Sequence, residues 1–318
     1  MDNFTHSMAG WALGQAGLKT KTRKGLAALI LGANMPDIDV FFGNAPWDPL
    51  AIHRGFTHGL VGGILVMPPI LAALLWLLDR WQLSHDRQFR SGLPMRVGWL
   101  IALSYLGALT HPLLDVLTTY SVQLLSPFSG LWFHADGLFI IDLWLWLLLA
   151  IAIGVSKRRE LRGLEWRRVP RVAIAVMLAY IGLNLVITDR ANAAVRQWAG
   201  ERPVEALFAS PPPLAFWRRG LVWREDHCYR RSRFDPVGGG LAPVSRCEPT
   251  NMNLPVVREA IRRDPRLAKF LKWSILPQAS VVRERCSVRV FIGDARYGEG
   301  RRSRLARESV VPTGAPGC

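Results

Sequence analysis

The sequence predicts a mainly α-helical membrane protein: a helical bundle with about four transmembrane helices and a short N-terminal helical hairpin, followed by a small extramembrane α+β domain. Three observations predict this class. Half of the 318 residues are hydrophobic, four long apolar stretches lie within the first 190 residues, and the chain nevertheless carries a net charge of +16. We therefore expect a membrane-embedded domain over residues 1–190 and a basic extramembrane domain over residues 191–318.

Each apolar stretch approaches the ~20 residues that a helix needs to cross a hydrocarbon core about 30 Å thick. The stretches cover residues 59–78, 97–125, 138–155 and 172–188. Pro68 and Pro69 interrupt the first, a single Asp interrupts the second, and Asp142 lies within the third. Four such stretches in one chain favour a multi-pass membrane protein over buried helices of a soluble core.

The basic loop 157–171 (KRRELRGLEWRRVPR) orients the predicted spans. It carries seven Lys and Arg against two Glu, so the positive-inside rule places it in the cytoplasm. Alternation then puts the loop 126–137 outside and the Arg-containing linker 80–96 inside. The segment HRGFTH (53–58) and everything after residue 189 are expected outside.

Two short apolar segments precede the first span. Residues 5–18 and 25–33 are compatible with helices and are joined by the basic turn KTKTRK. Pro36 is expected to end the second helix, because the residue before a proline is disfavoured in helical geometry. If the basic turn points to the cytoplasm, His6 and the sequence MPDID (35–39) both return to the outer side.

From Asp189 onward the composition changes. This part has 24 Lys and Arg against 13 Asp and Glu, a net charge of +11. The alternating stretch 280–293 predicts strands, and residues 256–273 predict a helix interrupted by Pro265. A disulfide is allowed if the compartment is oxidising. Cys228 is expected to pair with Cys247, with Cys286 as a competing partner. No nucleic-acid partner is expected, and the basic surface suits membrane lipids or solvent.

Histidines and aspartates gather on the predicted outer side. They are His6, Asp37, Asp39, His53, His58, His111, Asp115, His134, Asp136 and Asp142. Ionisable groups at membrane depth are costly unless something binds them, which makes them functional candidates. Imidazole nitrogens and carboxylate oxygens together are typical ligands of Zn²⁺ or Mn²⁺.

The spacing within the motifs supports shared ligation. His111 and Asp115 are four residues apart, which puts them on one helix face. Asp37 and Asp39 point to one side if the backbone there is extended. His53 and His58 reach one site if Gly55 allows HRGFTH to turn.

Each candidate also has a structural alternative. Asp39 and Asp136 suit loop carboxylates or caps, and Asp142 suits a helix cap. His134 suits an aromatic belt beside Trp132 and Phe133, and His6 alone suits a surface position. Convergence on one side of the membrane is the stronger indication of a metal site.

Four motifs in order resemble one known family. MPDID, HRGFTHGL, GALTHPLLDVLTTY with LLSPFSG, and FHADGLFIIDLWLW are similar to the bacterial YdjM-type inner-membrane metal-dependent hydrolases, described as LexA-binding. The likeness covers roughly residues 1–190, and FLKWSILP and DARY resemble the tail of the longer members. It implies a distant relation to zinc-dependent phospholipase C and P1-type nucleases. This chain has one HxxxD motif where those relatives have two.

The resemblance implies a membrane-bound metal-dependent hydrolase of phosphoesters. A site at the depth of the lipid headgroups suits a phospholipid or another amphiphilic ester as the substrate, and the alternation of the spans places the C-terminal domain in the periplasm. One to three divalent ions, zinc or manganese, are expected on His6, Asp37, His53, His58, His111, Asp115, His134 and Asp136. Asp39 is expected to accept a proton, and Arg54 to bind a phosphate oxygen. The alternative for Arg54 is a structural one, in which its side chain extends to the polar membrane interface. Two alternatives stay open: a metal- or proton-coupled transporter, and a non-catalytic scaffold with a structural metal.

Overall fold

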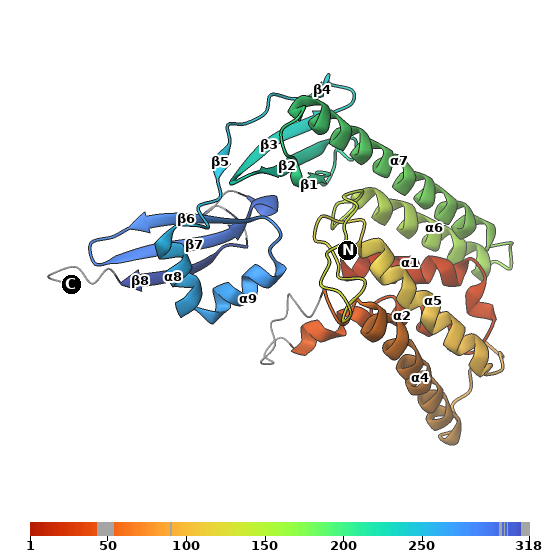
Figure 1. Cartoon of the computed structure of the whole chain (residues 1–318). Coiled ribbons are helices and arrows are strands. Elements are labelled where there is room, and N and C mark those ends of the chain that lie inside the picture. The colour runs from red at the N-terminus through yellow and green to blue at the C-terminus, as the bar shows by residue number, and fades with distance from the viewer. Residues whose placement is uncertain (43–53, 90, 299–300, 302, 304, 313–318) are drawn as a thin grey trace. The chain divides into compact units, whose positions relative to one another are not determined.

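The computed structural model describes residues 1–42, 54–89, 91–298, 301, 303 and 305–312 (Figure 1). The chain divides into two compact units, and α7 runs from the first into the second. Unit 1 comprises Met1–Val186 with Pro212–Phe216, and unit 2 comprises Ile187–Pro211 with Trp217–Cys318.

Unit 1 is helical. Its elements are α1 (Asn3–Gln15), η1 (Leu18–Thr20), α2 (Gly25–Gly32), η2 (Met35–Phe42), η3 (Leu60–Val66), α4 (Met67–Ser84), α5 (Val97–Asp115), α6 (Leu143–Leu161) and the first part of α7 (Arg168–Ala199). The expected N-terminal hairpin is present as α1 and α2. Asp2 begins α1 by accepting hydrogen bonds from the backbone N–H groups of Phe4 and Thr5.

Among the described residues, three helical segments are long and apolar enough to cross a membrane: Leu60–Ser84, Val97–Asp115 and Arg168–Ala199. The fourth expected span is not confirmed. Asp142 caps α6 through the N–H groups of Trp144 and Leu145, so this helix begins at Leu143 and not at residue 138. Lys157 and the charged residues after it fall within its last turns, which leaves an apolar part shorter than a span.

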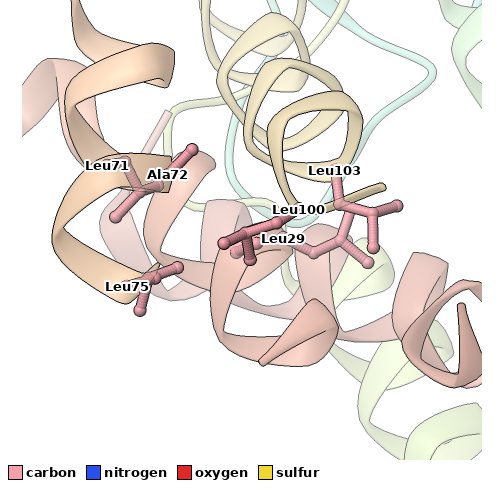
Figure 2. Close-up of a cluster of buried hydrophobic side chains, with 7 residues drawn as sticks. Leu29, Leu71, Ala72, Leu75, Leu100 and Leu103 are labelled. Carbon is pink, nitrogen blue, oxygen red and sulfur yellow. The ribbon is translucent and has the colours of Figure 1, made fainter. Parts of the chain in front are cut away.

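Helix α2 lies at the centre of unit 1. Leu29 of α2 packs with Leu71 and Leu75 of α4 and with Leu100 and Leu103 of α5 (Figure 2). Glycines let its neighbours come close: a Cβ at Gly10 of α1 or Gly107 of α5 would lie 2.6 Å from the carbonyl oxygen of Leu29. Small residues commonly permit such approaches between membrane helices.

Basic residues gather at one end of unit 1, where the turn between α1 and α2 contacts the ends of α4 and α6 and the start of α7. Lys19 pairs with Glu160 at 2.5 Å, and Arg23 pairs with the buried Asp79 at 2.7 Å. The Arg171 Nε donates to the carbonyl of Ala16 at 2.9 Å. The first turn of α1 and the last turn of α5 therefore lie at the opposite end, where the candidate ligands are.

Within its described residues, unit 2 contains the end of α7, two antiparallel sheets and the helices α8 and α9. Its elements are β1 (Glu205–Ser210), β2 (Arg219–Glu225), β3 (Cys228–Asp235), β4 (Gly240–Leu241), β5 (Glu248–Pro249), α8 (Pro255–Arg263), α9 (Pro265–Trp273), β6 (Pro277–Arg283), β7 (Ser287–Asp294), η4 (Ala295–Tyr297) and β8 (Arg307–Pro312). The first sheet has the order β1-β2-β3-β4 with β5 beside β3, and the second has the order β6-β7-β8.

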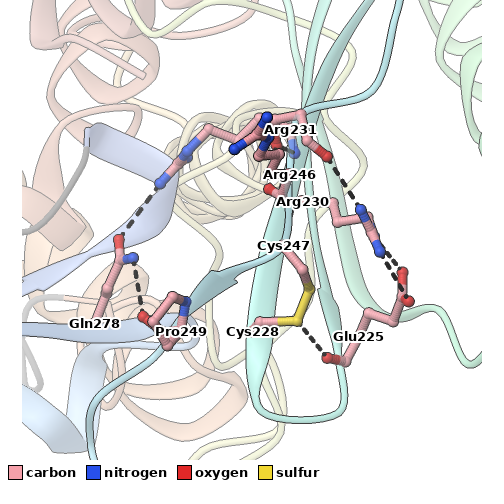
Figure 3. Close-up of a disulfide and its surroundings, with 9 residues drawn as sticks. Glu225, Cys228, Arg230, Arg231, Arg246, Cys247, Pro249 and Gln278 are labelled. Carbon is pink, nitrogen blue, oxygen red and sulfur yellow. Dashed lines mark hydrogen bonds and ion pairs between the residues drawn. A yellow bond between two sulfur atoms is a disulfide. The ribbon is translucent and has the colours of Figure 1, made fainter.

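Several expectations for the C-terminal part are confirmed. The alternating stretch forms β6 and β7, and the helix is interrupted before Pro265, where Asp264 caps α9. Cys228 and Cys247 form a disulfide with a Cα–Cα distance of 5.4 Å (Figure 3). The pair joins the start of β3 to the segment that precedes β5.

Candidate metal centre

Four segments of unit 1 bring five candidate ligands together. His6 comes from the first turns of α1, Asp37 from η2, His58 from the turn before η3, and His111 and Asp115 from the end of α5. All five side chains are buried, His6, His58, His111 and Asp115 fully so. Their ligand atoms form two groups that share His111: His6, His111 and Asp115, and Asp37, His58 and His111.

The distances show how tightly these atoms converge. The Nε2 atoms of His58 and His111 are 3.0 Å apart. The Oδ1 of Asp37 lies 3.2 Å from His58 Nε2 and 3.4 Å from His111 Nε2. The Oδ2 of Asp115 lies 3.2 and 3.5 Å from the same two nitrogens. Two nitrogens and two carboxylate oxygens therefore surround one point.

The opposite nitrogens of the two rings reveal their tautomers. His111 Nδ1 lies 2.6 Å from the carbonyl oxygen of Ala33, which can only accept, so this nitrogen carries the proton. The hydroxyl of Thr57 donates its single proton to Asp39 Oδ2 at 2.7 Å. The Thr57 oxygen, 3.1 Å from His58 Nδ1, therefore accepts from that ring.

Both neutral rings consequently direct the Nε2 lone pair at the shared point. Acceptors that face one another without a proton repel, and a cation between them removes the repulsion. At most one proton fits between nitrogens 3.0 Å apart. A mixed nitrogen and oxygen donor set of this kind fits Zn²⁺ or Mn²⁺.

His6 extends the donor set. Its ring stacks on His111 with centroids 3.8 Å apart, and its Nε2 lies 3.4 Å from Asp115 Oδ1. Neither of its nitrogens has a hydrogen-bond partner among the described residues. Burial and the neighbouring His111 lower the pKa of His6 well below its usual value, which keeps the ring neutral and able to bind a metal.

Positive charge beside Asp115 favours its ionised form. Asp115 is paired with Arg54, whose Nη1 lies 2.6 Å from Oδ2, and with the amino group of Met1. Ionised carboxylates next to neutral imidazoles are the forms that bind divalent cations.

Comparison with known proteins identifies the family. Residues 1–191 match the family described as YdjM inner membrane protein. The chain belongs to this family. It is also 29% identical over 289 residues to a Bacillus subtilis (strain 168) protein named "Uncharacterized protein YfhP", covering 86% of this chain and 80% of that protein. No solved structure matches the chain.

The region shared with the YdjM family contains all five clustered residues, whereas most of unit 2 lies beyond it. The family and the three apolar helices together indicate an inner membrane protein with several spans. Neither the family description nor the name of the relative assigns a reaction.

The remaining predicted site residues are placed differently. His53 lies outside the described residues. His134 and Asp136 form their own pair, with Nδ1 and Oδ1 3.1 Å apart, and belong to neither metal group among the described residues. Asp142 caps α6 and accepts a hydrogen bond from Tyr180 at 3.0 Å. Asp39 is also in neither group; its Oδ2 accepts from the hydroxyl of Thr57, whose oxygen lies beside His58 Nδ1.

Sequence reasoning missed two residues that orient the ligands. Thr57 lies inside HRGFTH and carries the hydroxyl that sets the tautomer of His58. Ala33 supplies the carbonyl that sets the tautomer of His111, from a residue 78 positions earlier in the chain. A Thr directly before a predicted ligand His was the one available signal, and nothing in the local sequence distinguishes the carbonyl of Ala33.

Proposed function

We propose that this YdjM-family protein is a membrane-embedded metal-dependent hydrolase that acts on a phosphoester at the outer face of the inner membrane. The observation that carries the proposal is the pair of Nε2 atoms of His58 and His111, 3.0 Å apart, unprotonated and enclosed by the carboxylates of Asp37 and Asp115. A divalent cation held there would polarise a phosphoryl oxygen and make water acidic enough to supply hydroxide near neutral pH.

The ligands divide into two overlapping positions. His58, His111 and Asp37 would hold one ion, and His6 with Asp115 and the shared His111 would hold a second. One imidazole nitrogen seldom serves two ions, so one fully bound ion, with His6 completing its shell, is the simplest arrangement. A second ion requires Asp115 to bridge, since its two oxygens face the two groups separately.

Arg54 is the residue suited to binding the substrate. Its guanidinium is buried beside the centre and already contacts Asp115. In the proposed complex its planar fork keeps one donor on Asp115 and offers another to a phosphoryl oxygen. Asp39 then has a positioning role: through Thr57 it orients His58, in place of the proton acceptance expected from the sequence.

The outer-face assignment is part of the proposal and rests on the two ends of unit 1. The basic turn after α1 pairs with the loop 157–171 region and with α4 at one end, and the positive-inside rule favours the cytoplasm for that end. The His and Asp residues lie at the other. Helix α7 starts at the basic end and reaches Asp142, before α6, through Tyr180. Residues after α7 are therefore expected in the periplasm.

Metal analysis combined with a turnover assay tests the function. Detergent-purified protein should contain about one zinc or manganese per chain and should hydrolyse a phosphodiester probe such as bis(p-nitrophenyl) phosphate. Chelation should abolish both, and readdition of the metal should restore both. Protein that is fully loaded but hydrolyses neither this probe nor phospholipid vesicles would exclude the hydrolase.

One observation favours a second function. Full burial of the ligands is also typical of a closed structural metal site, and it is found for His6, His58, His111 and Asp115. In that case metal removal should lower the thermal unfolding temperature of unit 1 without any activity to lose. A loaded protein with a large metal-dependent stability and no turnover is the expected result for this alternative.

A further inference from the structure

Unit 2 contains a groove of about 620 Å³ that has no part in the metal centre. It is lined by residues from the end of β1, from β2 and β3, from the segment after β4, and from η4 with Gly298. Its polar side chains are those of Arg231, Arg233, Arg296, Ser210, Ser232 and Ser245. Among the described residues, no Asp or Glu lines it. Its volume is within the range of small-molecule sites.

Arg233 supplies an exposed positive charge to this groove. It pairs across the sheet with Gly220, which itself pairs with Ser210. A Cβ added at Gly220 would meet only the carbonyl of Ser210, at 3.7 Å, so the surface beside Arg233 is free of side chains. Arg233 is exposed, and within the described part of the chain its guanidinium takes part in no hydrogen bond or ion pair.

Arg231, on the same face of β3, is held in place. Its Nη1 donates to the carbonyl of Ala295 at 2.8 Å. Its Nη2 lies 3.5 Å from Gln278 Oε1, as Figure 3 shows. Glu248 approaches its Nε only to 3.7 Å, which compensates the charge in part. Two residues apart on one strand face, Arg231 and Arg233 present neighbouring guanidinium groups.

Arg296 and the disulfide make the walls rigid. Arg296 is paired with the buried Asp294 at 2.8 Å and lies over the ring of Trp273. Ser245 is bonded to β3 in both directions, through its N–H to the carbonyl of Arg231 and through its Oγ to the N–H of Arg231. The Cys228–Cys247 disulfide ties this segment to the start of β3. A preformed wall reduces the entropic cost of binding.

We propose that this groove binds the phosphate group of a small molecule or lipid headgroup. Planar guanidinium groups match phosphate oxygens in pairs, and no Asp or Glu is among the described residues that line the groove. None of the residues that line this groove belongs to the metal centre, so the proposal does not depend on whether the protein is a hydrolase.

Hydrogen exchange of the full-length protein tests whether the groove binds phosphate, and whether the ligand is a soluble phosphate compound or a lipid headgroup. Protein in nanodiscs of neutral lipid is titrated with inorganic phosphate and glycerol phosphate, with chloride at matched ionic strength as the reference. A second sample contains phosphatidic acid in the nanodisc. Slower exchange in peptides from β3 and residues 242–245 is expected with at least one probe. Protection by the soluble probes indicates a free phosphate compound, and protection by phosphatidic acid alone indicates a lipid headgroup.

Two matched variants make the test specific. Arg233→Gln should weaken binding of the protecting probe at least fivefold. Arg283→Gln, which removes the same charge from an exposed position on β6 outside the groove, should bind like the parent protein. Equal weakening in both variants would show a general charge effect and overturn the site, as would saturable protection by none of the probes.

Discussion

The Nε2 atoms of His58 and His111 lie 3.0 Å apart, and each ring donates its proton in the opposite direction. Two lone pairs at this distance are unfavourable unless a cation lies between them. The two rings come from residues 53 positions apart, on a turn and on a membrane helix. This relationship links the fold of unit 1 to metal binding, and the first predictions follow from it.

Thr57 should determine the metal affinity of His58. Thr57→Val keeps the shape of the side chain but removes the oxygen between His58 and Asp39. Loss of such an orienting partner typically lowers metal affinity about 10–100-fold. Thr57→Ser retains the hydroxyl and should bind like the parent protein. Competition with a chromogenic chelator measures both, and equal affinity for the Val and Ser variants would contradict the orienting role.

Loss of metal ligands should be non-additive. His111→Ala should leave the purified protein with little metal, because His111 belongs to both donor groups. Asp37→Asn added to it should then change metal content and activity very little, since the site is already empty. Elemental analysis per mole of protein is the measurement. A double variant that retains stoichiometric metal would remove these residues from the site.

Arg54→Ala should separate metal binding from turnover. Arg54 contacts Asp115 but supplies no metal ligand, so metal content should remain near that of the parent protein. Phosphoester kcat/KM should fall about 10²–10³-fold, the usual cost of removing one donor to developing charge. His85→Ala, at the exposed C-terminal end of α4, is the control and should alter neither quantity. Unchanged turnover in Arg54→Ala would refute the phosphate role.

The basic end of unit 1 should face the cytoplasm, and residues after α7 should face the periplasm. A single cysteine introduced in the loop 157–171 should be labelled by a membrane-impermeant maleimide only after the inner membrane is opened. One introduced just after Arg190 should be labelled in intact spheroplasts. Labelling of both positions in the same compartment would mean that α7 does not cross, and the proposed outer-face site would have to be abandoned.

Asp294 should be essential for the stability of unit 2. It is fully buried and accepts bonds from Ser274, Ile275 and Arg296. Asp294→Asn leaves Arg296 without its counter-charge and should cost about 3–5 kcal/mol of unfolding free energy. Native-state hydrogen exchange of β7 in the full chain measures this, with Asp235→Asn, on a half-buried carboxylate of the other sheet, as the control.

The same carboxylate predicts a pH dependence. Burial raises the pKa of Asp294, but the Arg296 guanidinium outweighs it and leaves the pKa below its usual value. The unfolded state therefore binds the proton more readily than the folded state. The stabilisation should be complete above pH 3.8, the unfolded value, and should be lost as the pH falls through the lower folded pKa. Asp294→Asn should remove this acid-dependent change from the β7 amides.

Local features of this protein were determined by the sequence alone. The length of an apolar stretch decides whether a helix can cross a bilayer, and three of the four predicted stretches contain such helices. The four-residue spacing of His111 and Asp115 places them on one helix face, and Pro265 begins α9 just after α8 ends. Each of these effects acts within a few residues, so the sequence contains all the information it requires.

Tertiary packing decided the rest. Whether Asp142 would cap α6 or join the metal depended on Tyr180 of α7, and the position of Asp39 depended on Thr57. The tautomer of His111 was decided by the carbonyl of Ala33 just after α2, which comes within reach because Gly107 lets α5 approach α2 closely. Contacts between residues far apart in the chain depend on how helices pack, and that packing depends on the shapes of many side chains together.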